Sequence, residues 1–130
     1  LQWIQTAHRT TRWTASVCTG SLVLGAAGLL EGKAATTYWA SRDGLAQFGA
    51  TYRRRRYVEQ GKIITGAGVS AALDTSLIIA ARLAGDEVAG ALQLALEYDP
   101  QPPYDTGDFT KASPRTRRLA LKLVADADQP

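Results

Sequence analysis

One stretch, from Trp13 to Leu30, constrains the fold of this 130-residue chain more than any other; it reads W-T-A-S-V-C-T-G-S-L-V-L-G-A-A-G-L-L. Its first five residues, 13–17, predict a short buried strand. Cys18 follows at a turn, and the small and aliphatic residues that begin with Thr19 and Gly20 predict a helix. A strand, a sharp turn and a helix in this order indicate a nucleophile elbow, with Cys18 in the place that serine takes in the hydrolase pattern G-x-S-x-G.

The position of Cys18, the single cysteine of the chain, favours a reactive thiol. A cysteine at the start of a helix lies near the positive end of the helix dipole, which favours the thiolate form. The unpaired N–H groups of the first turn can also bind negative charge that develops on a substrate. Gly20 has no β-carbon, so the chain can turn tightly and a ligand can approach. The alternative is an inert core cysteine, which is the commoner role of a cysteine among apolar residues.

Three segments carry a resemblance to a known family; they read S-V-C-T-G-S-L-V-L-G-A-A-G-L-L-E-G-K-A-A-T-T-Y-W-A, G-K-I-I-T-G-A-G-V-S-A-A-L-D and L-Q-L-A-L-E-Y-D-P-Q-P-P-Y. The first resembles the nucleophile-elbow region of the ThiJ/PfpI family, within the class I glutamine amidotransferase-like superfamily. Within that family the chain is most similar to the isonitrile hydratase branch. The resemblance extends from Trp13 to Tyr104, which is most of the chain.

The resemblance implies a fold, a reaction and a set of site residues. The implied fold is α/β, a flavodoxin-like three-layer sandwich with a mainly parallel sheet and the cysteine elbow. The implied enzyme is a hydro-lyase that adds water to an isonitrile and yields an N-substituted formamide. Cys18 would be the nucleophile and Thr19 would assist it, while Gly20, Thr37 and Tyr38 would line the substrate and oxyanion pocket. The resemblance implies a small-molecule substrate, a homodimer, and neither a metal nor an organic cofactor.

Two other functions remain open within the same family. The elbow segment also occurs in regulators that join such a domain to an AraC-type DNA-binding domain, so the chain could be a ligand- or redox-sensing domain. An accessible cysteine that forms thiolate readily is also what a redox sensor requires. Deglycase- or glyoxalase-like chemistry is the third alternative. Many relatives carry histidine where this chain has Tyr38, and this difference argues mildly against that chemistry.

The chain is short for the family that it resembles. ThiJ/PfpI domains place several strands before the elbow, whereas only residues 1–12 precede the predicted strand here. We therefore expect residues 1–130 to belong to a single domain whose N-terminal portion is absent. A missing N-terminal half or a partner chain would complete the sheet and would supply an acidic residue beside Cys18.

Composition excludes several classes of protein. One cysteine excludes an internal disulfide, and with one histidine it leaves no convincing zinc site. A net charge of +3 is too small to argue for nucleic acid as a partner. No apolar run approaches the length of a membrane span, so no membrane partner is expected. An unpaired thiol fits the reducing cytoplasm, which is the expected location.

The remaining pattern alternates helices with strands, which is typical of α/β proteins. It predicts helices at 1–10, 41–48, 70–84, 86–97 and 114–125, and strands at 34–37, 52–58 and 62–65. Gly61 lies in a predicted hairpin turn between the last two strands. We expect His8, the only histidine, to have a structural role, because it lies before the first strand and far from the elbow.

Three further motifs are weaker indications of ligand binding. The arginines at 53–56 could bind nucleic acid, but charges on an exposed edge strand explain them more simply. The segment G-L-L-E-G-K suggests a phosphate-binding loop, but Ala27 and Ala34 stand where that motif needs glycine and serine or threonine. The glycines at 66–68 resemble a dinucleotide-binding turn, but a second helix follows where that fold has a strand.

Overall fold

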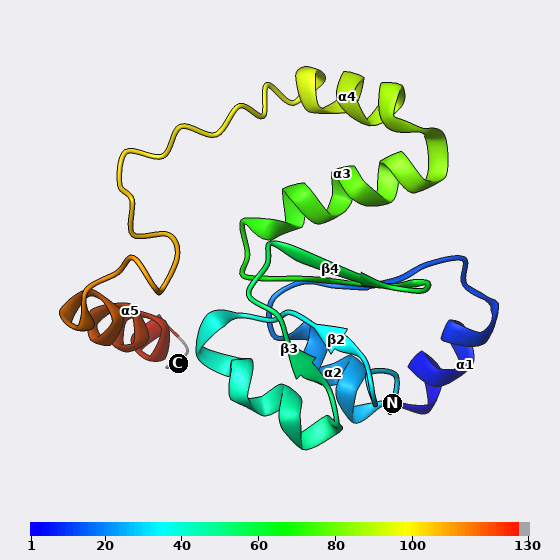
Figure 1. Cartoon of the computed structure of the whole chain (residues 1–130), viewed down its shortest axis with the longest axis horizontal. Coiled ribbons are helices and arrows are strands. Elements are labelled where there is room, and N and C mark those ends of the chain that lie inside the picture. Colours follow the sequence, from blue (N-terminus) through cyan, green and yellow to red (C-terminus); the bar gives the residue numbers. More distant parts are fainter. Residues whose placement is uncertain (128–130) are drawn as a thin grey trace. The chain divides into compact units, whose positions relative to one another are not determined.

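The computed structural model describes residues 1–127, and the chain divides into two compact units, Leu1–Tyr98 and Asp99–Pro130. The first unit contains all the strands and most of the helices of the described part of the chain (Figure 1). The described part of the second unit is an extended segment followed by one helix. No helix among the described residues is long and apolar enough to cross a membrane.

A three-stranded sheet lies at the centre of the first unit. Its order is β1 (Thr14–Ser16), β5 (Ile63–Gly66) and β4 (Tyr57–Gln60). β1 and β5 are parallel, and β5 and β4 form an antiparallel hairpin around Gly61, which has a positive φ of 60°. Every residue of β5 is buried, as expected for a strand with a partner on each side.

Two short strands form a second, parallel pair: β2 (Ala34–Ala35) and β3 (Thr51–Tyr52). The segment after β2 then approaches the main sheet, because the Thr36 N–H donates to the Oγ1 of Thr65 in β5 at 3.0 Å. Parallel pairing in two of the three strand pairs of the described residues agrees with the mainly parallel sheet that the sequence predicts.

Helices cover both sides of the hairpin. The first unit contains α1 (Gln2–Thr10), α2 (Gly20–Ala26), the 3-10 helix η1 (Trp39–Phe48), α3 (Ala71–Ala84) and α4 (Asp86–Ala95). Figure 1 shows α3 above the β4–β5 hairpin and α2 below it, so the arrangement has three layers. The helices predicted at 70–84 and 86–97 are confirmed to within two residues at each end.

The hydrophobic core lies between α2, η1 and the strands. It consists of six buried residues: Leu24, Leu30, Ala35, Leu45, Ala50 and Ile63. α2 and η1 approach closely because Gly25 lies under the ring of Phe48, where a β-carbon on Gly25 would come within 2.6 Å of a ring carbon. This close approach places η1 directly against the helix that follows Cys18.

The second unit is simple in its described part. The chain continues without helix or strand through several prolines and then forms α5 (Pro114–Ala127). Ser113 caps this helix, because its Oγ accepts a hydrogen bond from the Thr116 N–H at 3.1 Å. Pro114 follows as the first residue of the helix, a position where its missing N–H costs no hydrogen bond.

The prediction of one strand over residues 52–58 is wrong. The chain leaves β3 after Tyr52, bends through the arginines and joins the other sheet as β4 at Tyr57. The reason is a change of partner: the Arg53 N–H still donates to the carbonyl of Ala35 in β2, whereas Tyr57 pairs with Gly66 of β5. The arginines therefore lie between two strands and not on an edge strand as expected: Arg53 and Arg54 have no regular structure, and Arg55 and Arg56 form a bend before β4, the outer strand of the described sheet.

The α-helix predicted over residues 41–48 is also corrected. The segment is a 3-10 helix that begins at Trp39, and Ser41 does not cap it. The Ser41 N–H donates instead to the Tyr38 carbonyl, three residues back, which is the tighter 3-10 pattern. The predicted end at residue 48 is confirmed, and Gly49 follows it in the left-handed conformation with a φ of 69°.

Candidate active site

Cys18 lies at the sharp turn between β1 and α2, which confirms the predicted strand–turn–helix order. Its φ is 58°, in the left-handed region. A residue with a β-carbon pays about 1–2 kcal/mol for this conformation, and such residues concentrate at functional sites. The residue is partly exposed in the described structure, and its thiol is free of any disulfide.

The loop after β5 holds the backbone N–H of Cys18. This N–H donates to the carbonyl oxygens of Ala67, at 2.6 Å, and Gly66, at 3.2 Å. Gly66 also needs to be glycine, because a β-carbon there would come within 2.5 Å of the Thr75 Oγ1. The turn that carries Cys18 is therefore fixed by a loop from a distant part of the sequence.

Two hydroxyl groups hold the carbonyl oxygen of Cys18. The Thr37 Oγ1 donates to it at 3.0 Å and the Ser21 Oγ donates at 3.3 Å. Thr37 is almost fully buried, with 1% of its surface exposed. The family resemblance places Thr37 in the pocket, and in the structure the Thr37 side chain contacts the backbone of Cys18.

The first turn of α2 offers backbone donors beside the thiol. The Gly20 N–H is already engaged, because it donates to the Val17 carbonyl at 3.0 Å. No hydrogen bond from the Thr19 N–H is present within residues 1–127, and the Thr19 side chain is exposed. The Thr19 N–H, directly after Cys18, is therefore an unengaged backbone donor in the described part of the chain.

Tyr38 lies close to the same turn. Its ring contacts the Trp39 ring, with centroids 5.7 Å apart and planes at 59°. A β-carbon on Gly68 would lie 3.6 Å from the Tyr38 ring, so this ring packs on the loop that holds Cys18. The structure thus brings Cys18, Thr37 and Tyr38 to one end of the sheet, around the loop that contains residues 66–68.

His8 does not contribute to this arrangement in the described structure. Its Nδ1 hydrogen-bonds with the Thr14 Oγ1 at 2.7 Å, beside the start of β1. Burial and the nearby charges of Lys62 and Lys33 lower the pKa of His8 below its usual value. The Lys62 Nζ also donates to the His8 carbonyl, which agrees with the structural role expected for this residue.

Residues 1–127 contain no group of three potential metal ligands. A hollow of about 470 Å³ lies elsewhere on the first unit, and Cys18 is not among its lining residues. The lining residues are Ala34, Arg53, Arg55, Arg56, Tyr57, Val58, Glu59 and Gln60. The candidate active site is the elbow, because it carries the cysteine in the left-handed conformation, whereas this hollow contains no cysteine.

Comparison with known proteins decides the family. A model of the DJ-1/PfpI family matches residues 1–82, which is more than half of the chain. The chain belongs to the DJ-1/PfpI family. Among relatives in this family, isonitrile hydratase from Pseudomonas putida is 49% identical over 107 residues, which cover 82% of this chain and 47% of that protein.

Two further DJ-1/PfpI comparisons extend this result. A crystal structure of a THiJ/PfpI family protein from Pseudomonas syringae superposes with a TM-score of 0.88 at 42% identity, over 96% of this chain and 52% of that one. The HTH-type transcriptional regulator CdhR from Pseudomonas aeruginosa is 32% identical over 94 residues, which cover 68% of this chain and 27% of the regulator. The chain spans about half the length of the first two relatives.

These comparisons confirm the family and the α/β fold class that the sequence predicts. They also agree with the expectation that the chain corresponds to only part of its relatives. The catalytic roles of Cys18 and Thr19, the pocket roles of Gly20, Thr37 and Tyr38, the single domain, the homodimer and the cytoplasmic location stay predictions.

The sequence did not predict the backbone contacts between the elbow and the loop after β5. Ala67 accepts from Cys18 through its carbonyl and donates through its own N–H to the Arg56 carbonyl at 2.9 Å. The only signal in the sequence was the Gly-Ala-Gly turn at 66–68, which indicates a close backbone approach without naming its partner.

Proposed function

We propose that the chain is the cysteine-bearing part of an isonitrile hydratase-like enzyme with Cys18 as its nucleophile. The main support is the left-handed, partly exposed Cys18 at a strand–helix turn in a chain 49% identical to an isonitrile hydratase. Strained backbone at an exposed nucleophile is the arrangement that nucleophile elbows use.

The proposed reaction proceeds through a covalent intermediate. The Cys18 sulfur attacks the terminal carbon of the isonitrile, and this carbon receives a proton, so that a thioimidate forms with an S–C bond. Water then adds to the same carbon, and the C–S bond breaks. The nitrogen ends with one hydrogen, the carbon becomes the carbonyl of an N-substituted formamide, and the thiol is regenerated.

The neighbours of Cys18 have distinct proposed roles. Thr19 would orient or donate to the group on which charge changes, through its hydroxyl or its available N–H. Thr37 would keep the turn in place through the Cys18 carbonyl, and Tyr38 would line the substrate pocket beside Gly20. An acidic residue outside residues 1–130 would carry the proton, and the scheme uses no metal or organic cofactor.

The test is formamide production from a simple alkyl isonitrile by the full-length protein. Cys18→Ala should abolish turnover, and Thr19→Val should reduce it by about 10²–10³-fold, the range for loss of one charge-stabilising donor. Thr116→Val, in the second unit, serves as a control that should leave turnover unchanged. A Cys18→Ala enzyme that turns over at the wild-type rate would rule out covalent catalysis.

The second candidate is a sensing domain of a transcriptional regulator. The similarity to the regulator CdhR over 68% of this chain favours it. Such a domain would bind or sense through the same cysteine without consuming an isonitrile. Absence of turnover in the wild-type protein, together with reversible oxidation of Cys18 by dilute peroxide, would favour this function over the enzyme.

A further inference from the structure

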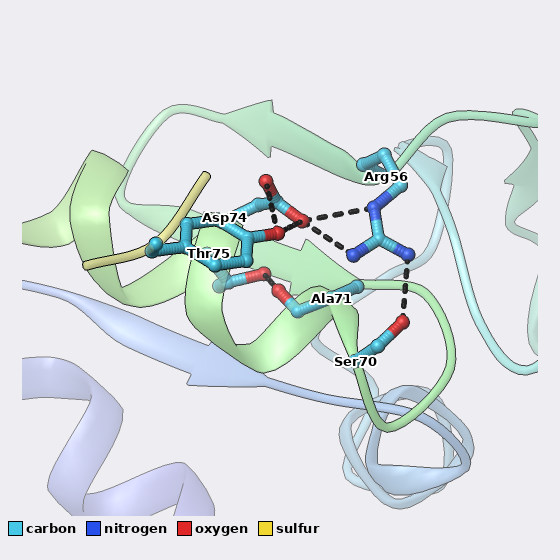
Figure 2. Close-up of polar contacts among 6 residues, drawn as sticks. Arg56, Ser70, Ala71, Asp74 and Thr75 are labelled. Carbon is cyan, nitrogen blue, oxygen red and sulfur yellow. Dashed lines mark hydrogen bonds and ion pairs between the residues drawn. The ribbon is translucent and has the colours of Figure 1, made fainter. Parts of the chain in front are cut away.

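A cluster of polar side chains lies at the start of α3, directly after the loop that holds Cys18. Arg56 donates from Nε and Nη2 to the Oδ2 of Asp74, at 2.9 and 2.5 Å, and from Nη1 to the Oγ of Ser70 at 3.0 Å (Figure 2). The Tyr98 hydroxyl donates to the same carboxylate at 3.3 Å. None of these residues belongs to the proposed reaction, so the cluster needs its own explanation.

The cluster joins the segment before β4 to the start of α3, directly after the loop that contacts Cys18. Arg56 precedes β4, whereas Ser70 and Asp74 lie at the start of α3, directly after the loop. Figure 2 shows the Arg56 side chain extending from the segment just before β4 to the start of α3. Arg56 therefore contacts the point at which the loop between β5 and α3 ends.

The same arginine also contacts the loop through its backbone. The Ala67 N–H donates to the Arg56 carbonyl at 2.9 Å, and the Ala67 carbonyl accepts from the Cys18 N–H at 2.6 Å. Two backbone hydrogen bonds thus lead from the Arg56 carbonyl through Ala67 to Cys18, while the Arg56 guanidinium bonds to Ser70 and Asp74 at the start of α3. A left-handed residue persists only when its surroundings hold it there, and Ala67 supplies one of these restraints.

We propose that Arg56 and Asp74 are positioning residues for Cys18, holding the Ala67 carbonyl so that the thiol keeps its reactive orientation. This proposal rests on the proposed role of Cys18 as a reactive thiol. It assigns the two residues no contact with substrate. Arg56 also lines the hollow described above, together with Arg53 and Arg55.

The chain contains a matched control for this proposal. Arg82 donates from Nε and Nη2 to the Glu59 carboxylate at 3.0 and 2.9 Å. This pair also joins α3 to the β4 segment, and its side chains are 41% and 26% exposed against 50% and 29% for Arg56 and Asp74. It lies at the other end of α3, away from the loop that holds Cys18.

The experiment measures two properties of the full-length protein: the rate of Cys18 alkylation by iodoacetamide across pH, with peptide mapping, and the midpoint of urea unfolding. Arg56→Gln and Asp74→Asn should each lower the alkylation rate at pH 7 by about tenfold, below the roughly hundredfold that a 1 Å misplacement can cost. Arg56→Lys should fall between wild type and Arg56→Gln, since lysine keeps the charge but not the fork of donors. The double variant Arg56→Gln/Asp74→Asn should be no slower than either single variant.

Arg82→Gln separates positioning from general stability. It should shift the unfolding midpoint about as much as Arg56→Gln and leave the pH profile of alkylation unchanged. If Arg56→Gln and Arg82→Gln give the same alkylation profile, the proposal is wrong. If Arg56→Gln does not fold, Ser70→Ala removes only one of the three bonds, and an unchanged alkylation rate in that variant and in Asp74→Asn overturns the proposal.

The alkylation assay does not depend on isonitrile turnover, so the two proposals fail separately. A wild-type protein without hydratase activity, whose alkylation still depends on Arg56, would refute the proposed reaction and support the positioning role. If the protein is an active hydratase, and neither its alkylation rate nor its kcat changes in the Arg56 variants, the proposed reaction is supported and the positioning role is refuted.

Discussion

The centre of the first unit and its α3–α4 flank differ in how much apolar surface they bury. Ile64 of β5 is fully buried, whereas on α4 Leu94 is 80% exposed and Leu92 is 44% exposed. Leu73 and Leu83 on α3 are also exposed. The centre is thus specified by contacts within the described residues, whereas the flank presents apolar side chains that those residues do not cover.

One edge of the sheet is also left open by the described residues. Within the described residues β1 pairs only with β5, so its second edge carries no strand. Two polar atoms, the Oγ of Ser16 in β1 and the Nε1 of Trp13 just before β1, are buried and have no hydrogen-bond partner in the described part of the chain. The described residues therefore bury β5 among themselves and leave the second edge of β1 and the α3–α4 flank open.

The largest effect is expected when residues 1–130 are expressed alone. At about 25 cal/mol per Å², a few hundred Å² of exposed apolar surface cost several kcal/mol, which is comparable to the stability of a small domain. The isolated chain should therefore self-associate or lose fixed packing. Sedimentation and near-UV circular dichroism measure this, and a cooperative, well-packed monomer would show that the open surfaces are tolerated.

A pair of truncations sharpens the contrast between core and flank. Ile64→Ala should lower the free energy of unfolding of the full-length protein by about 2–5 kcal/mol, because it leaves a cavity in the sheet. Leu94→Ala should change it by less than about 0.5 kcal/mol if α4 stays exposed. Urea unfolding measures both, and a loss of 2 kcal/mol or more for Leu94→Ala would show that the flank is covered in the complete protein.

A pair of glycine substitutions tests the same contrast with opposite signs. Gly25→Ala should destabilise the protein by about 1–3 kcal/mol, because its β-carbon would meet the Phe48 ring at 2.6 Å. Gly90→Ala, on α4, meets nothing within 4 Å and should stabilise the helix by about 0.5–1 kcal/mol. Thermal unfolding compares the two, and equal effects would contradict the packing described for α2 and η1.

How much of this could be predicted from sequence depends on how local the cause is. The elbow at Cys18 follows from neighbouring residues, since apolar strand, turn and small-residue helix are adjacent in the chain. The Ala67–Cys18 contact could not be predicted, because it depends on the pairing of β1 with β5 across a long separation. The family resemblance indicated Thr37 and Tyr38, but their contacts needed the structure.

The two errors in secondary structure have the same origin. The arginine run has the composition of an edge strand, but the residue at which the chain changes sheets is set by partners at Ala35 and Gly66. Helical periodicity does not distinguish a 3-10 from an α-helix over ten residues, so η1 was predicted as the commoner form. Tertiary packing decided both cases.

The smallest expected effect concerns pH and α1. The pKa of His8 is lowered in the folded protein, so its contribution to stability is present above the unfolded value of about 6.5 and is lost as pH falls through the folded value. Stability should therefore decrease modestly between pH 7 and pH 5. His8→Gln, which does not titrate, should remove this part of the pH dependence, and an unchanged slope in thermal unfolding would contradict the assignment.

The central claim is that the Cys18 thiol carries the chemistry, and one measurement tests it most directly. The full-length protein is alkylated with iodoacetamide until peptide mapping shows Cys18 fully modified, and formamide production from an alkyl isonitrile is then compared with untreated enzyme. The account predicts that activity falls in proportion to the fraction of Cys18 modified and reaches zero at full modification. Formamide production at the untreated rate after full modification would contradict it.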